Sequence, residues 1–252
     1  MLLLSSGRES AEALGKCLII RSGGSKALVL SDLHIGYEES FSERGAMVQR
    51  FQLEDFKTEL SEVFKRTGRP KLTIIAGDLK HEFGRISRQE WRESLEVLDF
   101  LSAHSERVVL VRGNHDNVLG PIASRKDLGV VEEFKLGGFL IIHGHKIPMS
   151  ESLRRIHTII IGHEHPAITI SDGVRSEPFK CFLVGRTGRF NLIVLPSFSQ
   201  IYEGTDVRGA SFLSPMLKNS DLGSFRVVAC GPSLSNYDFG RLSRLEAIFG
   251  NE

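Results

Sequence analysis

The sequence predicts an α/β fold in which two mixed β-sheets face each other and helices flank them. Short apolar runs rich in β-branched residues alternate with amphipathic helix patterns through roughly the first two thirds of the chain. After His165 the pattern changes to short strands joined by glycine-containing turns, as in the hairpins of a second sheet. A length of 252 residues, 41% of them hydrophobic, allows a substantial buried core.

The bulk composition constrains the function only weakly. No repeat, low-complexity tract or long linker divides the chain, so a single domain over residues 1–252 is expected. Lys and Arg number 32 against 31 Asp and Glu, so no overall field attracts nucleic acid. The three cysteines form no CxxC pair, which argues against a thiolate metal site and favours the reducing cytoplasm. No signal peptide and no membrane association are expected, because no apolar run approaches the roughly 20 residues that span a bilayer.

Two helix patterns separate the first predicted strands. The first covers residues 48–66 and is closed by Gly68 and Pro70. Its apolar side chains recur at helical spacing and share one face: Phe56, Leu60, Val63 and Phe64. The second helix is expected to start at Ser87, whose hydroxyl can cap it while Glu90 completes a capping box.

The strand signals are strongest in the first two thirds of the chain. Five apolar runs there predict buried strands: residues 27–30, 72–76, 108–111, 139–142 and 158–161. Weaker strand signals follow at 167–170, 179–184, 190–195 and 225–229. The role of segment 233–252 is open, although Leu242, Leu245 and Ile248 indicate a short terminal helix.

Each of the five strong strands ends directly in residues that can bind a metal. The five turns read Ser31-Asp32-Leu33-His34, Gly77-Asp78, Gly113-Asn114-His115-Asp116, His143-Gly144-His145 and Gly162-His163-Glu164-His165. Seven of the nine histidines lie in or beside these turns. Because functional groups gather at the carboxyl ends of strands in open α/β sheets, we expect the turns to meet at one edge.

The chemistry of these side chains predicts a centre with two metal ions. Imidazole and carboxylate without thiolate suit Mn, Fe, Zn or Co better than Ca or Mg. A carboxylate such as Asp78 can bridge two ions about 3.5–4 Å apart. Two divalent ions with the carboxylates of Asp32 and Asp78 leave a positive centre that suits an anionic phosphate ester. Manganese is the expected metal, with Fe, Zn, Co and Mg as alternatives.

The order of the five motifs resembles the calcineurin-like metallophosphoesterases, and the motifs span residues 31–165. The stretches 31–37 and 77–81 look closest to the SbcD-related prokaryotic branch, whose relatives include nucleases that repair double-strand breaks. Segments 195–198 and 204–206 resemble the short phosphoesterases of that branch. At 252 residues, the chain is expected to lack the capping domain and the ATPase-binding helices of those nucleases.

The resemblance implies a role for each motif residue. One metal ion would be held by Asp32, His34, Asp78 and His165. The second would be held by Asp78, Asn114, His143 and His163. His115 would face the leaving group without binding metal, and Asp116 would orient its ring or cap the following helix. His81 would contact the substrate phosphate, and His145 is either a second substrate contact or a loop residue.

Some assignments near the motifs stay open at this point. His143 is preferred to His145 as the ligand because it directly follows its strand, yet spacing alone does not decide between them. Four cations near the motifs either bind a phosphate backbone or are scattered surface charge: Lys80, Arg85, Arg112 and Lys146. Glu164 is expected to face solvent, and His104 and His157 to be structural.

Three functions are compatible with this pattern. The first is a phosphodiesterase that uses a metal-activated hydroxide, with DNA as the favoured substrate and nuclease activity as the result. The second is a hydrolase of small nucleotides or phosphomonoesters at the same centre. The third is a non-catalytic scaffold of the same fold, ranked last because every expected motif residue is present.

Overall fold

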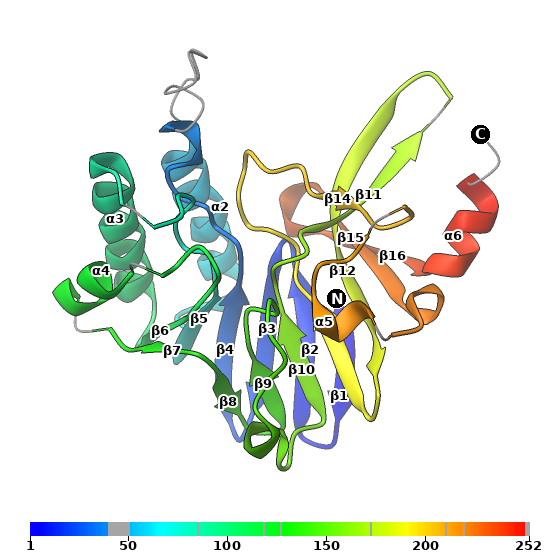
Figure 1. Ribbon diagram of the computed structural model, residues 1–252, viewed down its shortest axis with the longest axis horizontal. Coiled ribbons are helices and arrows are strands. Elements are labelled where there is room, and N and C mark those ends of the chain that lie inside the picture. The colour runs from blue at the N-terminus through cyan, green and yellow to red at the C-terminus, as the bar shows by residue number, and fades with distance from the viewer. Residues whose placement is uncertain are drawn as a thin grey trace.

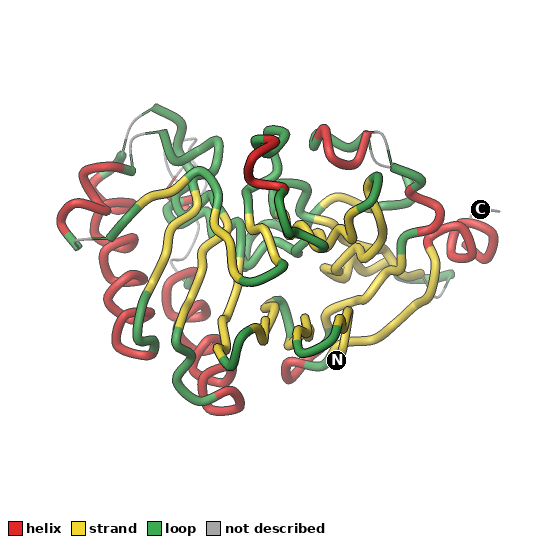
Figure 2. Tube along the Cα trace, turned by 90° about the horizontal axis from the view of Figure 1, so that it is seen from below, coloured by secondary structure: helices red, strands yellow, loops and turns green. Residues whose placement is uncertain are grey.

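Two β-sheets face each other, and helices cover their outer faces (Figures 1 and 2). The structure, a computed structural model, describes residues 1–39, 51–84, 86–117, 119–126, 128–171, 173–209, 211–218 and 220–249. The predicted α/β class with two facing sheets and flanking helices is confirmed.

The first sheet contains seven strands whose spatial order follows the chain. Their bounds are β1 Leu2–Ser6, β2 Glu9–Leu14, β3 Cys17–Ser22, β4 Ser25–Leu30, β5 Leu72–Ala76, β6 Val108–Val111 and β7 Val130–Val131. Strands β1 to β4 pair antiparallel, and β4 to β7 pair parallel. The predicted strands 27–30, 72–76 and 108–111 correspond to β4, β5 and β6, whereas β1, β2 and β3 were not predicted.

The second sheet has nine strands. Their bounds are β8 Phe134–Leu136, β9 Phe139–Ile141, β10 Thr158–Ile161, β11 Pro166–Ser171, β12 Ser176–Thr187, β13 Phe190–Val194, β14 Thr205–Asp206, β15 Arg226–Cys230 and β16 Asn236–Arg241. All six strands predicted after residue 138 are confirmed, with shifts at their ends. Strands β9, β10 and β13 run parallel, and the β11–β12 hairpin projects beyond the rest of the sheet (Figure 1).

The described helices are short except for two. Their bounds are α2 Gln52–Thr67, α3 Arg88–His104, α4 Gly120–Arg125, α5 Pro215–Lys218 and α6 Leu242–Phe249. The helix predicted over 48–66 is α2, and residues 48–50 lie outside the described residues. In α3, Ser87 Oγ accepts from the backbone N of Glu90 at 3.0 Å, and Glu90 Oε2 accepts from the backbone N of Ser87 at 3.1 Å. The predicted capping box and terminal helix are therefore confirmed.

Three apolar layers hold the sheets and helices together. Phe56 and Leu60 of α2 pack with Leu98 of α3 on the outer face of the first sheet. A second layer, which includes Phe139 and Phe182, fills the space between the sheets. A third layer joins the outer face of the second sheet to α5 and α6. Each fully buried large side chain stabilises the fold by roughly 1.5–3 kcal/mol. No helix among the described residues combines the length and apolar character that crossing a bilayer requires.

A polar contact joins the sheets at the amino ends of β9 and β10. Glu9 accepts hydrogen bonds from the backbone N of Gly138 at 3.1 Å and from Nε2 of His157 at 2.6 Å. Burial opposes ionisation of Glu9, but the hydrogen bonds from Ser22 and His157 outweigh it and lower the pKa of this carboxyl. His157 is thus structural, as expected. His104, which stacks on Phe64, is structural as well.

Candidate metal centre

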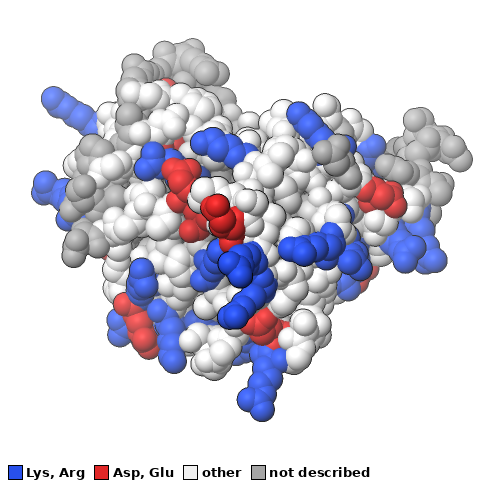
Figure 3. Space-filling view, turned by 60° about the horizontal axis from the view of Figure 1, so that its bottom comes forward, with Lys and Arg blue, Asp and Glu red and all other residues white. Residues whose placement is uncertain are grey.

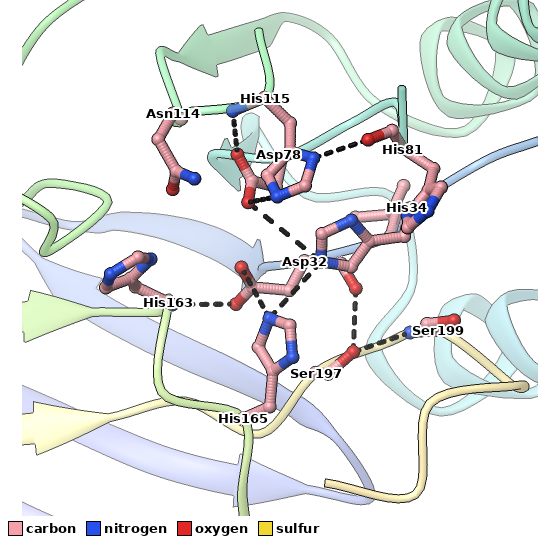
Figure 4. Close-up of polar contacts among 12 residues, drawn as sticks. Asp32, His34, Asp78, His81, Asn114, His115, His163, His165, Ser197 and Ser199 are labelled. Atoms are coloured by element: carbon pink, nitrogen blue, oxygen red, sulfur yellow. Dashed lines mark hydrogen bonds and ion pairs between the residues drawn. The ribbon is translucent and has the colours of Figure 1, made fainter. Parts of the chain in front are cut away.

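The polar turns that follow β4, β5, β6, β9 and β10 meet between the two sheets (Figure 4). The first three strands belong to the first sheet and the last two to the second, so the centre is built across the sheet-to-sheet interface. Three groups of side chains bring potential ligand atoms within 4.8 Å of one another: Asp32, His34 and His165; Asp32, Asp78 and His143; and His34, His81 and His115. The expected convergence of the five motifs is observed.

Five of the seven expected ligands have a backbone conformation that is rare outside glycine. Their φ angles are 55° at Asp32, 47° at His34, 51° at Asp78, 71° at His163 and 47° at His165. Each such residue costs of order 1–3 kcal/mol, and such conformations cluster at functional sites. Backbone hydrogen bonds between neighbouring turns hold two of them, from Asp32 N to Gly77 O at 3.0 Å and from His34 N to Asp78 O at 3.1 Å. This backbone strain lowers the stability of the fold, and in return it directs these side chains inward.

Each central carboxylate is anchored through one oxygen and presents the other to imidazoles. Asp78 Oδ1 accepts from the backbone N of His115 at 2.9 Å, and Asp32 Oδ2 accepts from the backbone N of His163 at 3.0 Å. The second oxygen of each faces ring nitrogens, at 3.4 Å between Asp78 Oδ2 and His143 Nε2 and 3.1 Å between Asp32 Oδ1 and His165 Nε2. Both acids are at most 2% exposed. The anchoring fixes the direction of each remaining oxygen.

Glycines at two turns allow the neighbouring loops to come this close. A Cβ at Gly113 would overlap Oδ1 of Asp78, and a Cβ at Gly162 would overlap Oγ of Ser31 and Oδ2 of Asp32. These glycines are therefore needed for space at the carboxylates.

The side chains around Asp32 fit a divalent cation. Nε2 of His34 and Nε2 of His165 face each other at 3.3 Å, next to Oδ1 of Asp32. Two buried imidazole nitrogens that face each other beside a carboxylate need a shared proton or a cation between them. Burial and the nearby His165 lower the pKa of His34 to about 3, which keeps its ring neutral, the form that binds metals.

A second set of ligand atoms surrounds Asp78 and His143. Nδ1 of His143 donates to the carbonyl of Ala76 at 3.0 Å, which leaves Nε2 directed at Asp78 and at Oδ1 of Asn114, 2.9 Å away. This arrangement, in which one ring nitrogen is fixed by a carbonyl, is typical of metal-bound histidines. Burial disfavours the charged ring, but Asp78 and Asp32 outweigh it and raise the pKa of His143 to about 9. A bound cation has to replace that proton.

The remaining expected ligands border this set. The ring of His163 lies 5.0 Å from that of His143, and burial together with His143 lowers the pKa of His163 to about 4. The ring of His145 lies 5.2 Å from that of His143 and 6.1 Å from that of His163. It belongs to none of the three groups among the described residues. His163 likewise belongs to none of them, whereas His143 shares a group with Asp32 and Asp78.

His115 lies beside the carboxylates, but Asp116 does not orient it. Nε2 of His115 is 3.7 Å from Oδ2 of Asp78, and its Nδ1 donates to the carbonyl of His81. The Asp116 carboxylate instead accepts from three backbone N–H groups, those of Gly113, Asp78 and Leu79. The expected orientation of the His115 ring by Asp116 is wrong, because the three backbone donors occupy its buried carboxylate. Asp116 holds the Asp78 turn, and burial and the charge of Asp78 raise its pKa to about 6.

Two further expectations are corrected by burial. Lys80 is fully buried and donates to the carbonyl of Glu82, so it is neither surface charge nor available to a phosphate backbone. Glu164 does not face solvent, because it is 8% exposed and accepts from the backbone N of Leu213 and of Ser214. Arg85 lies outside the described residues.

Several residues around the centre were not predicted. Ser197 Oγ donates to the carbonyl of Asp32 at 2.8 Å, and Gln52 Nε2 donates to the carbonyls of Leu33 and His34 at 3.0 Å. The ring of Tyr202 stacks on His34 with a centroid distance of 5.7 Å. These residues are far from the metal motifs in sequence, and only Ser197 lies in a segment that the resemblance had singled out.

The part of the chain that carries these turns, residues 25–179, matches the sequence model of the calcineurin-like phosphoesterases. The chain belongs to this family. It is therefore a metal-dependent phosphoesterase, and the His and Asp groups at the five turns could hold the divalent ions that this family uses. Such ions, when bound, supply positive charge for a phosphate ester and lower the pKa of water.

One solved structure agrees with this fold. The chain aligns with the nuclease MPE of Pseudomonas putida at a TM-score of 0.65 and 19% identity, covering 94% of this chain and 98% of the other. It aligns with Yfce, a phosphoesterase from E. coli, at a TM-score of 0.45 and 16% identity, covering 85% and 97%. No curated protein matches the sequence.

Proposed function

We propose that this phosphoesterase hydrolyses phosphodiester bonds of nucleic acid, with DNA as its substrate. The observation that carries the proposal is a recess of about 200 Å³ that adjoins His143. Its lining includes the cations Lys146 and Arg112, the latter ion-paired with Glu132 at 3.0 Å, together with His145 and Glu133. A polymer needs such cations beside the reacting phosphate, because they position the neighbouring phosphates of the strand. The similar fold of the Pseudomonas putida nuclease MPE supports the same substrate class.

We propose two divalent ions, preferably manganese, at the centre. Asp32, His34, Asp78 and His165 would hold the first. Asp78, Asn114, His143 and His163 would hold the second. His115 would act on the substrate without binding metal, and His81 and His145 would contact the substrate. The support is the donor set itself, because carboxylates and neutral imidazoles suit Mn and its neighbours among the transition metals.

Cations beside the centre matter because the chain as a whole carries almost no net positive charge to attract a polymer. Lys and Arg side chains lie among Asp and Glu on the face shown in Figure 3, and the formal net charge is only +1. Affinity for a polymer therefore has to come from the residues around the centre. We expect Lys146, which is exposed, to contribute one phosphate contact.

The test compares four substrates in the presence of Mn: a single-stranded and a duplex oligodeoxynucleotide, bis(p-nitrophenyl) phosphate and p-nitrophenyl phosphate. Oligonucleotide cleavage should weaken as salt rises. Lys146→Ala should reduce the slope of log(kcat/KM) against log[salt] by about 0.7–0.9. The control is Lys71→Ala, an exposed lysine just before the amino end of β5, away from the centre, which should leave the slope unchanged. Hydrolysis of the small esters without oligonucleotide cleavage at any salt would instead establish a small-molecule hydrolase.

A further inference from the structure

Phe83 is a large aromatic side chain that is 57% exposed next to the candidate catalytic histidine. Its ring centroid lies 3.6 Å from that of His115, with 35° between the ring planes. The other exposed aromatic side chains among the described residues are Phe51 and Tyr237. Within that part of the chain, neither ring contacts a histidine of the centre. Keeping this ring in water costs hydrophobic free energy that burial against a ligand would recover.

Phe83 belongs to a series of rings along one side of the centre. The ring of His115 faces that of His81 at 5.7 Å, and His81 lies 4.1 Å from the ring of Tyr37. Tyr37 stacks on Tyr202 at 5.5 Å. The recess with Arg112, Lys146, Glu132 and Glu133 lies on the side of His143 and His145, which also line it. The two sides therefore differ in chemistry, one aromatic and one charged.

We propose that Phe83 forms a subsite for a nucleobase next to the reacting phosphate, and that the substrate is an unpaired strand. The inference rests on the proposed function and specifies its substrate. A base–aromatic stack contributes about 1–3 kcal/mol and accepts any base, because every base has a π-face. In a duplex, both faces of each base are covered by its neighbours, so the subsite selects strands whose bases are free to leave the stack.

The position of Phe83 determines which base it binds. Nε2 of His115 is 3.7 Å from Oδ2 of Asp78, one of the two central carboxylates, and Phe83 covers the ring of this same histidine. If a phosphate is held at the carboxylates and imidazoles, the ring of His115 lies between it and the ring of Phe83. The base bound there belongs to a nucleoside attached directly to that phosphate.

A different role for Phe83 would be to position the ring of His115. These two roles predict different substrate dependence. A positioning residue affects the reaction of every substrate alike, whereas a base-binding residue affects only substrates that carry the base. An abasic analogue of the same strand therefore separates them.

The experiment uses a single-stranded thymidine tetranucleotide whose outer linkages are methylphosphonates, so that only the central phosphodiester can be cleaved. Two analogues each replace one of the central bases by an abasic deoxyribose. Phe83→Ala should lower kcat/KM for the full substrate by about 5–150-fold, the equivalent of one lost stack. It should leave one of the two abasic analogues within about twofold of wild type. Phe83→Trp should restore the full substrate, and Tyr237→Ala, which removes a comparably exposed ring on β16, should change none of these values.

The outcomes are distinct for the subsite and for the proposed function. Equal loss on the full substrate and on both abasic analogues would overturn the subsite and make Phe83 a positioning residue for His115. The subsite would also be overturned if the wild type cleaved the full substrate and both abasic analogues with the same kcat/KM. That result would leave the nuclease proposal intact. Failure of the wild type to cleave any oligonucleotide with Mn would refute the nuclease proposal itself. Placing the cleavable linkage in a duplex should slow the wild type more than Phe83→Ala.

Discussion

The two sheets contribute different chemistry to the same centre. The turns of the first sheet supply both carboxylates, Asp32 and Asp78, whereas the turns of the second sheet supply only imidazoles. Asp78 is anchored by the backbone of His115 within its own sheet, but Asp32 is anchored by the backbone of His163 in the other. The first sheet thus supplies the negative charge of the centre. The second sheet adds imidazoles and holds the Asp32 carboxylate in place through the backbone of His163.

The strongest test of this division removes a carboxylate of the first sheet. Asp78→Ala should abolish phosphoesterase activity and reduce the metal content, because Asp78 Oδ2 lies near His34, His115 and His143 at once. Metal analysis after gel filtration, with circular dichroism as the check on folding, measures this independently of activity. Asp55→Asn on an exposed face of α2 is the matched control. Full activity of the folded Asp78→Ala variant would contradict the role of Asp78 at the centre.

A smaller effect is expected at His115, which is also in the first sheet but is assigned no metal. His115→Ala should keep the metal content of the wild type and lower kcat by about 10²–10⁴-fold, the usual range for a lost general acid or base. Steady-state kinetics and metal analysis on the same preparation distinguish the two roles. A parallel loss of metal would make His115 a ligand.

Two buried carboxylates allow the sheets to be compared directly. Asp116 holds the backbone of the Asp78 turn, and Glu164 holds Leu213 and Ser214 beside the second-sheet turn. Asp116→Ala should weaken metal affinity by about 10–100-fold, as for residues that support ligands. Glu164→Ala should mainly lower the free energy of unfolding, by about 1–3 kcal/mol for the unpaired donors. Isothermal titration with Mn and urea denaturation measure the two effects, and equal losses of metal affinity would remove the distinction between the sheets.

The smallest effect on the protein is expected at the other end of the strands. There Glu9 joins the two sheets, away from the five turns of the candidate metal centre. Its pKa is lowered on folding, so its ionised form contributes stability above its ordinary pKa, and that contribution is lost as the pH falls through the folded value. Glu9→Gln should therefore lower stability by about 1–2 kcal/mol at neutral pH. The difference from wild type should vanish in acid, with kcat unchanged. A difference that persists after the pH has fallen below the folded pKa of Glu9 would show that packing, rather than charge, is responsible.

The same division explains what the sequence could predict. Strands β5, β6 and β10 are fully buried, so they read as continuous apolar runs, and they were predicted with their observed bounds. β2 was missed because Glu9–Leu14 mixes acids, serine and alanine and lacks β-branched residues. Its strand conformation comes from pairing with β1 and β3, not from local preference.

At the centre, the residue types and their order were readable, but the contacts between turns were not. The sequence indicates Asp116 as a partner of its neighbour His115 or as a helix cap, whereas its carboxylate contacts Asp78, which β5–β6 pairing brings close. Tyr202 gave no signal, because its contact with His34 depends on the packing of a distant loop. Phe83 follows His81 by two residues and could have been noticed as an aromatic beside a metal motif.

The order of the proposed ligands along the chain affects how the protein is made. Asp32 and Asp78 emerge from the ribosome first, and His143, His163 and His165 follow only after β6 and α4 have been synthesised. At about 5–20 residues per second, the nascent chain holds both acids for several seconds before the first of these imidazoles arrives. The complete set of ligands exists only once β9 and β10 have formed and docked against the first sheet. The complete proposed site therefore forms late in biosynthesis, after both sheets have assembled.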